Sequence, residues 1–86
     1  MKAYPLVFLE WHDASDEKET WLKTAEISDE PYIVHSIGFL VRETAKYLTL
    51  AGDQAPSDDD TDITWGRVTK VPVNMIQQRS TLVKGE

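Results

Sequence analysis

The 86-residue chain has no cysteine, only two histidines and four isolated glycines. The absence of cysteine excludes a disulfide framework and any zinc site built from thiolates. Glycines that stand singly do not form the Gly-rich cradle with which nucleotide-binding loops hold phosphate. No run of about 18 apolar residues exists, so we expect no membrane span. The N-terminus also lacks the basic segment and long apolar run of a signal peptide, which favours a cytoplasmic protein.

Candidate catalytic and metal-binding groups are equally sparse. The two histidines do not have the spacing of a metal motif, and no serine lies in a nucleophile-elbow context. The series Asp58, Asp60 and Asp62 is similar to the start of a calcium loop, but Ile63 and Thr69 stand where that loop needs Gly and Glu. We therefore predict that the protein is not an enzyme and that it has no catalytic residues, no metal site and no cofactor.

Charge is unevenly distributed along the chain, which carries 15 acidic and 9 basic residues for a net charge of −6. The acidic residues gather in residues 10–30 and 51–62, a pattern typical of solvated loops. Residues 63–86 carry four basic side chains against Glu86 alone. The net charge argues against a protein that coats duplex nucleic acid, yet the basic C-terminal quarter offers a surface to a smaller anionic ligand.

A chain of this length forms one domain, which we place at residues 1–86 with an acidic insertion at about 12–30 and an acidic loop at about 52–62. A single core of this size typically supplies only about 3–5 kcal/mol of stability, and small domains often add staples or partners. Because disulfides are excluded, the length favours self-association.

Alternating or continuous apolar residues predict five strands. A short helix or an ordered loop follows the first of them. If it is a helix, Ser15 caps it and Trp21, Leu22 and Ala25 face inward. Pro72 ends the fourth strand, and one tight turn at 73–75 leads to the fifth. The predicted strands cover residues 6–11, 32–43, 47–51, 63–71 and 76–83.

Gly38 lies near the middle of the second predicted strand. A glycine inside a strand is unfavourable unless a sharp bend or a close backbone approach requires it. Bends and bulges let a few strands close on themselves. We therefore expect a mainly β protein, a small and strongly bent five-stranded antiparallel barrel. Its exposed strand edges favour assembly of several copies into a ring.

Two segments resemble the first and second motifs of the Sm-like family of small β-barrels. Gly38-Phe39-Leu40-Val41 and Tyr47-Leu48-Thr49-Leu50 are similar to the first motif, and Lys70 to Ile76 stands where the family has a one-turn connection between its last strands. The resemblance implies an Sm-like barrel and a homo-oligomeric ring. Thr44, Tyr47 and Pro72-Val73 replace the motif residues that shape uridine pockets in RNA-binding members. The chain also resembles small tailed-phage proteins, which implies the host cytoplasm as its location.

Trp65 next to Gly66 and Arg67 is the most suggestive local combination. An aromatic ring can stack on a base while a nearby cation holds phosphate. The alternative is that Trp65 packs in the barrel or at a subunit contact, where aromatic residues and arginine are favoured. The candidate ligand or nucleic-acid site consists of Trp65, Arg67, Lys70, Tyr47 and Arg79.

Two functions fit these features. The first is a non-enzymatic oligomeric barrel that serves as a scaffold or protein-interaction module, for example in a phage-infected cell. The second is binding of RNA, other single-stranded nucleic acid or a nucleotide through the basic and aromatic strand surface.

Overall fold

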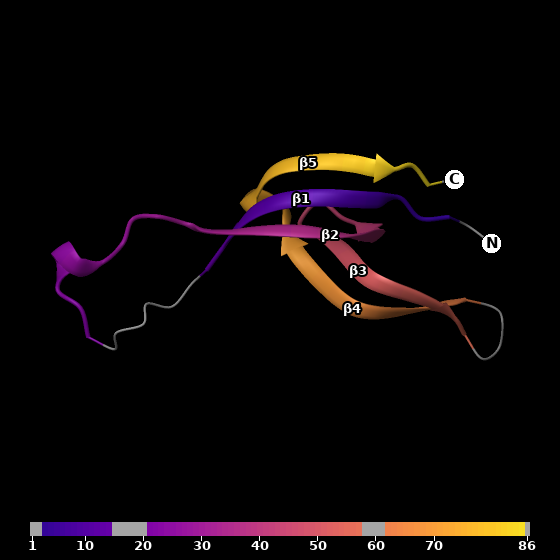
Figure 1. Ribbon diagram of the computed structural model, residues 1–86, viewed down its shortest axis with the longest axis horizontal. Coiled ribbons are helices and arrows are strands. Elements are labelled where there is room, and N and C mark those ends of the chain that lie inside the picture. Colours follow the sequence, from indigo (N-terminus) through magenta and orange to yellow (C-terminus); the bar gives the residue numbers. More distant parts are fainter. Residues whose placement is uncertain (1–2, 15–20, 58–61, 86) are drawn as a thin grey trace.

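The computed structural model describes residues 3–14, 21–57 and 62–85, and its main feature is one five-stranded antiparallel sheet (Figure 1). The strand order is β4-β3-β2-β1-β5, and a 3₁₀ turn connects β4 with β5. The elements are β1 (Leu6–Asp13), η1 (Thr24–Glu26), β2 (Tyr32–Glu43), β3 (Tyr47–Pro56), β4 (Ile63–Pro72), η2 (Val73–Met75) and β5 (Ile76–Val83).

The prediction of a mainly β protein with five antiparallel strands is confirmed, and the predicted turn at 73–75 is η2. The largest difference in strand length is at β3, which continues to Pro56 through part of the expected acidic loop. This extension pairs with β4 from Asp53 opposite Gly66 to Pro56 opposite Ile63. Local composition indicated a loop there, but cross-strand pairing supplies a partner for the backbone.

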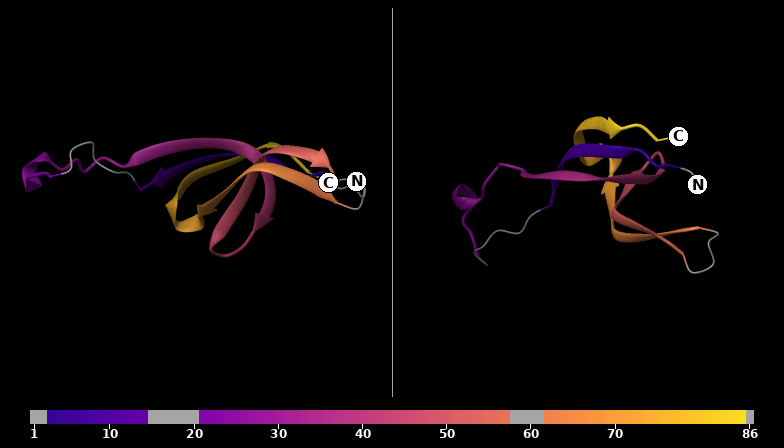
Figure 2. Two further views of the ribbon diagram at one scale, coloured as in Figure 1. Left: turned by 90° about the horizontal axis from the view of Figure 1, so that it is seen from below. Right: turned by 45° about the vertical axis from the view of Figure 1, so that its right-hand side comes forward.

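The expected closure into a barrel is wrong for the part of the chain that the structure describes. Strands β4 and β5 lie at opposite margins of the sheet and do not pair with each other. Strand β3 pairs with β2 only from Phe39 to Glu43, so the N-terminal half of β2 has a ladder with β1 alone. Register shifts in the β1–β5 and β2–β3 ladders let the strands curve without closing the sheet (Figure 2).

The sequence left a short helix or an ordered loop open for the segment between β1 and β2, and the described part of this segment contains no α-helix. The start of that helix lies outside the described residues, and residues 21–31 contain one 3₁₀ turn, η1. Trp21 is 91% exposed and Ala25 is exposed, so the expectation that they face inward is wrong. The segment projects beyond the sheet (Figure 1), which leaves these side chains no core to contact.

A small core lies on one face of the sheet. Alternation along β1 places Val7, Leu9 and Trp11 on this face, and the indole Nε1 of Trp11 donates a hydrogen bond to Ser36 Oγ at 3.1 Å. Partly buried side chains from β2 and β5 pack around the cluster. The buried hydrophobic residues in the described chain are Val7, Leu9, Trp11, Leu48, Leu50, Ala51 and Val71.

Gly38 is buried where β2 begins to pair with β3. A Cβ atom at this position would lie 2.7 Å from the carbonyl oxygen of Ala51. The sequence left a sharp bend or a close backbone approach open for this glycine, and the structure shows the close approach, because no larger residue fits without moving β3.

Candidate functional site

The candidate residues lie on three strands and do not converge on one point. Tyr47 is paired with Pro72 at one end of the β3–β4 ladder, while Trp65 is paired with Gln54 near the other end. Trp65 and Pro72 are seven positions apart on β4, a span of about 23 Å at the usual rise of a strand. The fifth candidate, Arg79, lies on β5 at the far margin of the sheet. The structure therefore does not assemble the five residues into one pocket.

Trp65 is half-buried among aromatic side chains of its own chain. Its ring meets Tyr4 edge to face with a centroid distance of 4.9 Å, and it lies 5.9 Å from Phe39 at an angle of 52°. Such edge-to-face and tilted pairs are favourable arrangements of aromatic quadrupoles. This geometry agrees with the packing interpretation of Trp65, because part of the indole surface that a base would need is already in contact.

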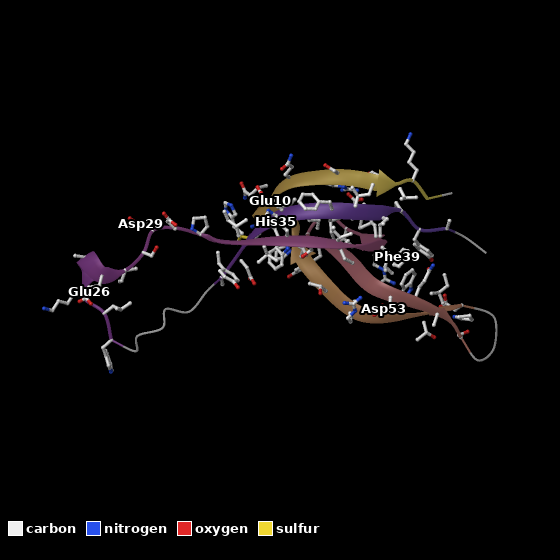
Figure 3. All side chains as sticks on the ribbon, viewed as in Figure 1. Glu10, Glu26, Asp29, His35, Phe39 and Asp53 are labelled. Carbon is white, nitrogen blue, oxygen red and sulfur yellow. The ribbon has the colours of Figure 1, made fainter. Side chains whose placement is uncertain are left out.

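Arg67 forms a bidentate ion pair with Asp53 across the β3–β4 ladder. The Nε–Oδ2 distance is 2.7 Å and the Nη2–Oδ1 distance is 3.2 Å (Asp53 is labelled in Figure 3). The hydrogen bond from Arg67 holds the pKa of Asp53 below its usual value, and the nearby positive charge adds to the effect. Because of this ion pair, the guanidinium of Arg67 is already bound to a carboxylate of its own chain. The backbone at Arg67 is left-handed, with φ of 51°, which is uncommon for a residue other than glycine.

Arg79 is similarly paired with Glu43. The distances are 2.9 Å for Nη1–Oε2 and 3.1 Å for Nη2–Oε1, and they join β5 to the C-terminal end of β2. The hydrogen bonds from Arg79 hold the pKa of Glu43 below its usual value, with a further contribution from the charge of Arg79. Of the three cations in the candidate site, only Lys70 has no ion pair with a described residue.

A stability measurement against pH tests the Arg79–Glu43 pair. The pKa of Glu43 is lower in the folded chain, so its contribution to stability is present above the ordinary value of 4.5 and is lost as the pH falls through the folded value. Both side chains are more than one third exposed, so we expect less than about 1 kcal/mol. In urea unfolding, the free energy of unfolding of Glu43→Gln should therefore fall slightly less than that of the wild type as the pH is lowered from 6 to 3.

The matched control for this test is Glu30→Gln, which changes an exposed carboxylate that has no ion pair with a described residue. Its acid profile should follow that of the wild type. Identical profiles for Glu43→Gln and the wild type would contradict a stabilising Arg79–Glu43 pair.

A third polar pair, His35 with Glu10, was not found from the sequence. The His35 Nε2–Glu10 Oε1 distance is 3.0 Å across the β1–β2 ladder, and the imidazole also lies 5.5 Å from the ring of Phe8 (Figure 3). Only the register of β1 against β2 brings these residues opposite each other. In the described part of the chain, no three His, Asp or Glu side chains gather to hold a metal ion.

Shallow hollows on the surface do not combine these polar groups into a reaction centre. One of about 330 Å³ lies where β3 separates from β2, and it includes Ser36, Gly52 and Arg67. Ser36 Oγ accepts the hydrogen bond from Trp11, and Arg67 is held by Asp53. The arrangement therefore offers a lining for a small molecule, while its polar atoms already stabilise the fold.

No helix among the described residues has the length and apolar character needed to cross a membrane. Comparison of the chain with protein-family models, with curated proteins and with solved structures finds no match.

Proposed function

We propose that this protein is a non-enzymatic module that assembles with further copies of itself, as an Sm-like ring does, and serves as a scaffold for protein partners in a phage-infected cell. The observation that carries the proposal is the pair of long, unpaired margins that β4 and β5 give to one open sheet.

Each margin presents a row of backbone donors and acceptors that has no partner strand among the described residues. Strand β4 has ten residues and β5 has eight, and most of their side chains are exposed. Such long edges are templates for pairing with another chain. Because β4 and β5 are at opposite margins, β4 of one copy and β5 of the next can pair head to tail, and repetition of that contact gives a closed ring or an open filament.

Charge does not oppose this contact. The arginines of the two margins, Arg67 and Arg79, are each neutralised by a carboxylate from the same chain. Lys70 is the cation of β4 that has no such partner among the described residues. Two edges that would otherwise repel each other therefore approach with little net charge.

The small core adds a reason for association. Its buried residues come mainly from β1 and β3, and the exposed large hydrophobic residues include Val68 on β4 and Leu82 on β5. A domain of this size has a small free energy of unfolding. Burial of apolar side chains along β4 and β5 would increase that free energy.

The Sm-like part of the proposal is supported by the segments that carry the resemblance. Gly38 lies in a curved β2, Leu48 and Leu50 point into the core from β3, and η2 joins β4 to β5 in one turn. The alternative function, binding of RNA, single-stranded nucleic acid or a nucleotide, has less support. Two of its three cations are paired, and Trp65 is in contact with Tyr4 and Phe39.

Light scattering and proline substitution on β5 test the proposal. We expect the wild type at micromolar concentration to have a mass several times 9.8 kDa. Consecutive strand residues direct their N–H groups to opposite sides, so Ser80→Pro and Thr81→Pro form a matched pair. The substitution whose N–H points to β1 removes a backbone hydrogen bond of the β1–β5 ladder and destabilises the fold. The other substitution removes an N–H from the outer edge of β5 and blocks only pairing with another strand.

The variant whose melting temperature equals that of the wild type, both measured at a concentration low enough to keep the chains dissociated, should be a monomer at the concentrations where the wild type assembles. A wild type that remains monomeric at every concentration would refute the proposal. Unchanged assembly of the folded proline variant would exclude β5 as the contact.

A further inference from the structure

The described segment between β1 and β2, residues 21–31 and here called the arm, is the most prominent feature that the proposed edge contact leaves unexplained. It extends past the end of the sheet, on the side opposite the two termini (Figures 1 and 2). Trp21 is 91% exposed and Ile27 is 51% exposed. Large apolar side chains of this kind at the end of a projecting segment are typical anchors of protein interfaces.

A hollow of about 350 Å³ lies between Ala3, the C-terminal part of β2 and Gly85, away from the arm. Its apolar lining comes from Tyr4, Pro5, Leu40 and Val41. The volume is at the lower end of the range of about 300–1,000 Å³ that is usual for pockets that take a ligand-sized group. It suits a single large side chain.

The arm and the rim of this hollow have opposite charges. The arm carries Glu26, Asp29 and Glu30 against Lys23, so its net charge is −2, and Figure 3 shows Glu26 and Asp29 on the projecting part. At the hollow, the carboxylate of Glu43 is already bound by Arg79. The remaining cation of the lining, Arg42, has no ion pair with a described residue.

The arm does not reach this hollow within its own chain. It leaves the β1–β2 ladder at Asp13 and Tyr32, and Leu40 lies eight positions further along β2, a span of about 26 Å. The arm also points away from the hollow, and the molecule is 56 Å long. Contact between them is therefore a contact between molecules.

We propose that the hollow beside Tyr4 and Leu40 receives Trp21 from the arm of a second copy, with the acidic residues of that arm facing Arg42. The inference rests on the proposed self-association and adds a second contact to it. A donor at one end and an acceptor at the other again make a head-to-tail interface, which closes into a ring or continues as a filament. The arm then adds a second contact between neighbouring copies that are already paired through their strand edges. We call this contact between Trp21 and the hollow the latch.

Substitution of Trp21 measures the contribution of this latch. Trp21→Ala should raise the dissociation constant of the assembly about tenfold or more, as the loss of an aromatic anchor does. The melting temperature of the dissociated chain should be unchanged, because Trp21 is exposed. The matched control is Tyr32→Ala, which removes an exposed aromatic ring from β2 outside the arm and should leave the dissociation constant unchanged.

The absence of native cysteine allows a direct test by disulfide formation between two differently tagged chains. A chain with Leu22→Cys on the arm should cross-link on oxidation to a chain with Ala3→Cys at the hollow. It should not cross-link to a chain with Asn74→Cys on the exposed turn η2. The same experiment in the folded β5 proline variant separates the arm contact from the strand-edge contact.

A cross-link between the Leu22→Cys chain and the Ala3→Cys chain that persists in the proline variant supports the latch even where edge pairing is lost. An assembly that survives Trp21→Ala unchanged and gives no such cross-link overturns the latch and leaves edge pairing intact. A monomeric wild type that gives no cross-link overturns both contacts.

Discussion

Replacement of Leu9 by alanine should lower the free energy of unfolding by about 2–5 kcal/mol, the usual cost of a large-to-small change in a well-packed core. Leu9 is completely buried in the middle of β1, the strand that lies between β2 and β5. The removed methyl groups leave a cavity in a cluster that has few other members. In a domain of this size such a loss is comparable with the whole stability of the fold.

Urea or thermal unfolding followed by circular dichroism measures this effect at a protein concentration low enough to keep the chain dissociated. The matched control is Leu82→Ala, which makes the same chemical change on β5 at a side chain that is 51% exposed. The control should cost about 0.5 kcal/mol or less. Equal losses for the two variants would contradict the assignment of the core to the Val7–Leu9–Trp11 face.

Gly38→Ala should destabilise the fold by about 1–3 kcal/mol through overpacking. The added Cβ would lie 2.7 Å from the carbonyl oxygen of Ala51, and that atom belongs to the backbone of β3. A flexible side chain could rotate away, whereas this oxygen moves only if the neighbouring pair of Phe39 with Ala51 is displaced. The expected result is therefore a lower melting temperature together with weaker amide protection where β2 meets β3.

Gly66→Ala is the matched control for this prediction. The nearest side-chain atoms to a Cβ at Gly66 belong to Asp53 and lie 3.4 Å away, which is ordinary contact. The control should be nearly neutral or slightly stabilising, because alanine restricts the unfolded chain more than glycine does. If Gly66→Ala were as damaging as Gly38→Ala, the close approach of β2 and β3 would not explain the requirement at Gly38.

The strands were predictable because their signals are local. Pro31 and Pro72, the alternation from Tyr47 to Leu50 and the continuous apolar run of β1 mark where extended backbone is favoured. The C-terminal part of β3 was missed because Gly52 and Asp53 favour a turn on their own. Only the facing strand β4 stabilises extended backbone there, with Gly66 opposite Asp53 and the side chain of Arg67 bound to the Asp53 carboxylate.

The candidate site was harder to predict than the strands. Trp65 and the four other candidates were chosen because they are basic or aromatic and lie in the C-terminal strands and in β3. Two of the cations belong to ion pairs whose partners, Asp53 and Glu43, are 14 and 36 positions away. Separations of that kind follow from register, and register is not encoded in any short window of sequence.

By itself, the sequence determined the positions of the strands apart from the C-terminal part of β3, the unusual place of a glycine inside β2 and the absence of thiol chemistry. Tertiary structure decided that the sheet stays open, that the arm projects with Trp21 in solvent, and that Arg67 and Arg79 are neutralised. The physical reason is the range of the interactions. Backbone preference acts between neighbours in the chain, whereas closure, burial, ion pairing and the close approach of Gly38 to Ala51 depend on which distant segments meet.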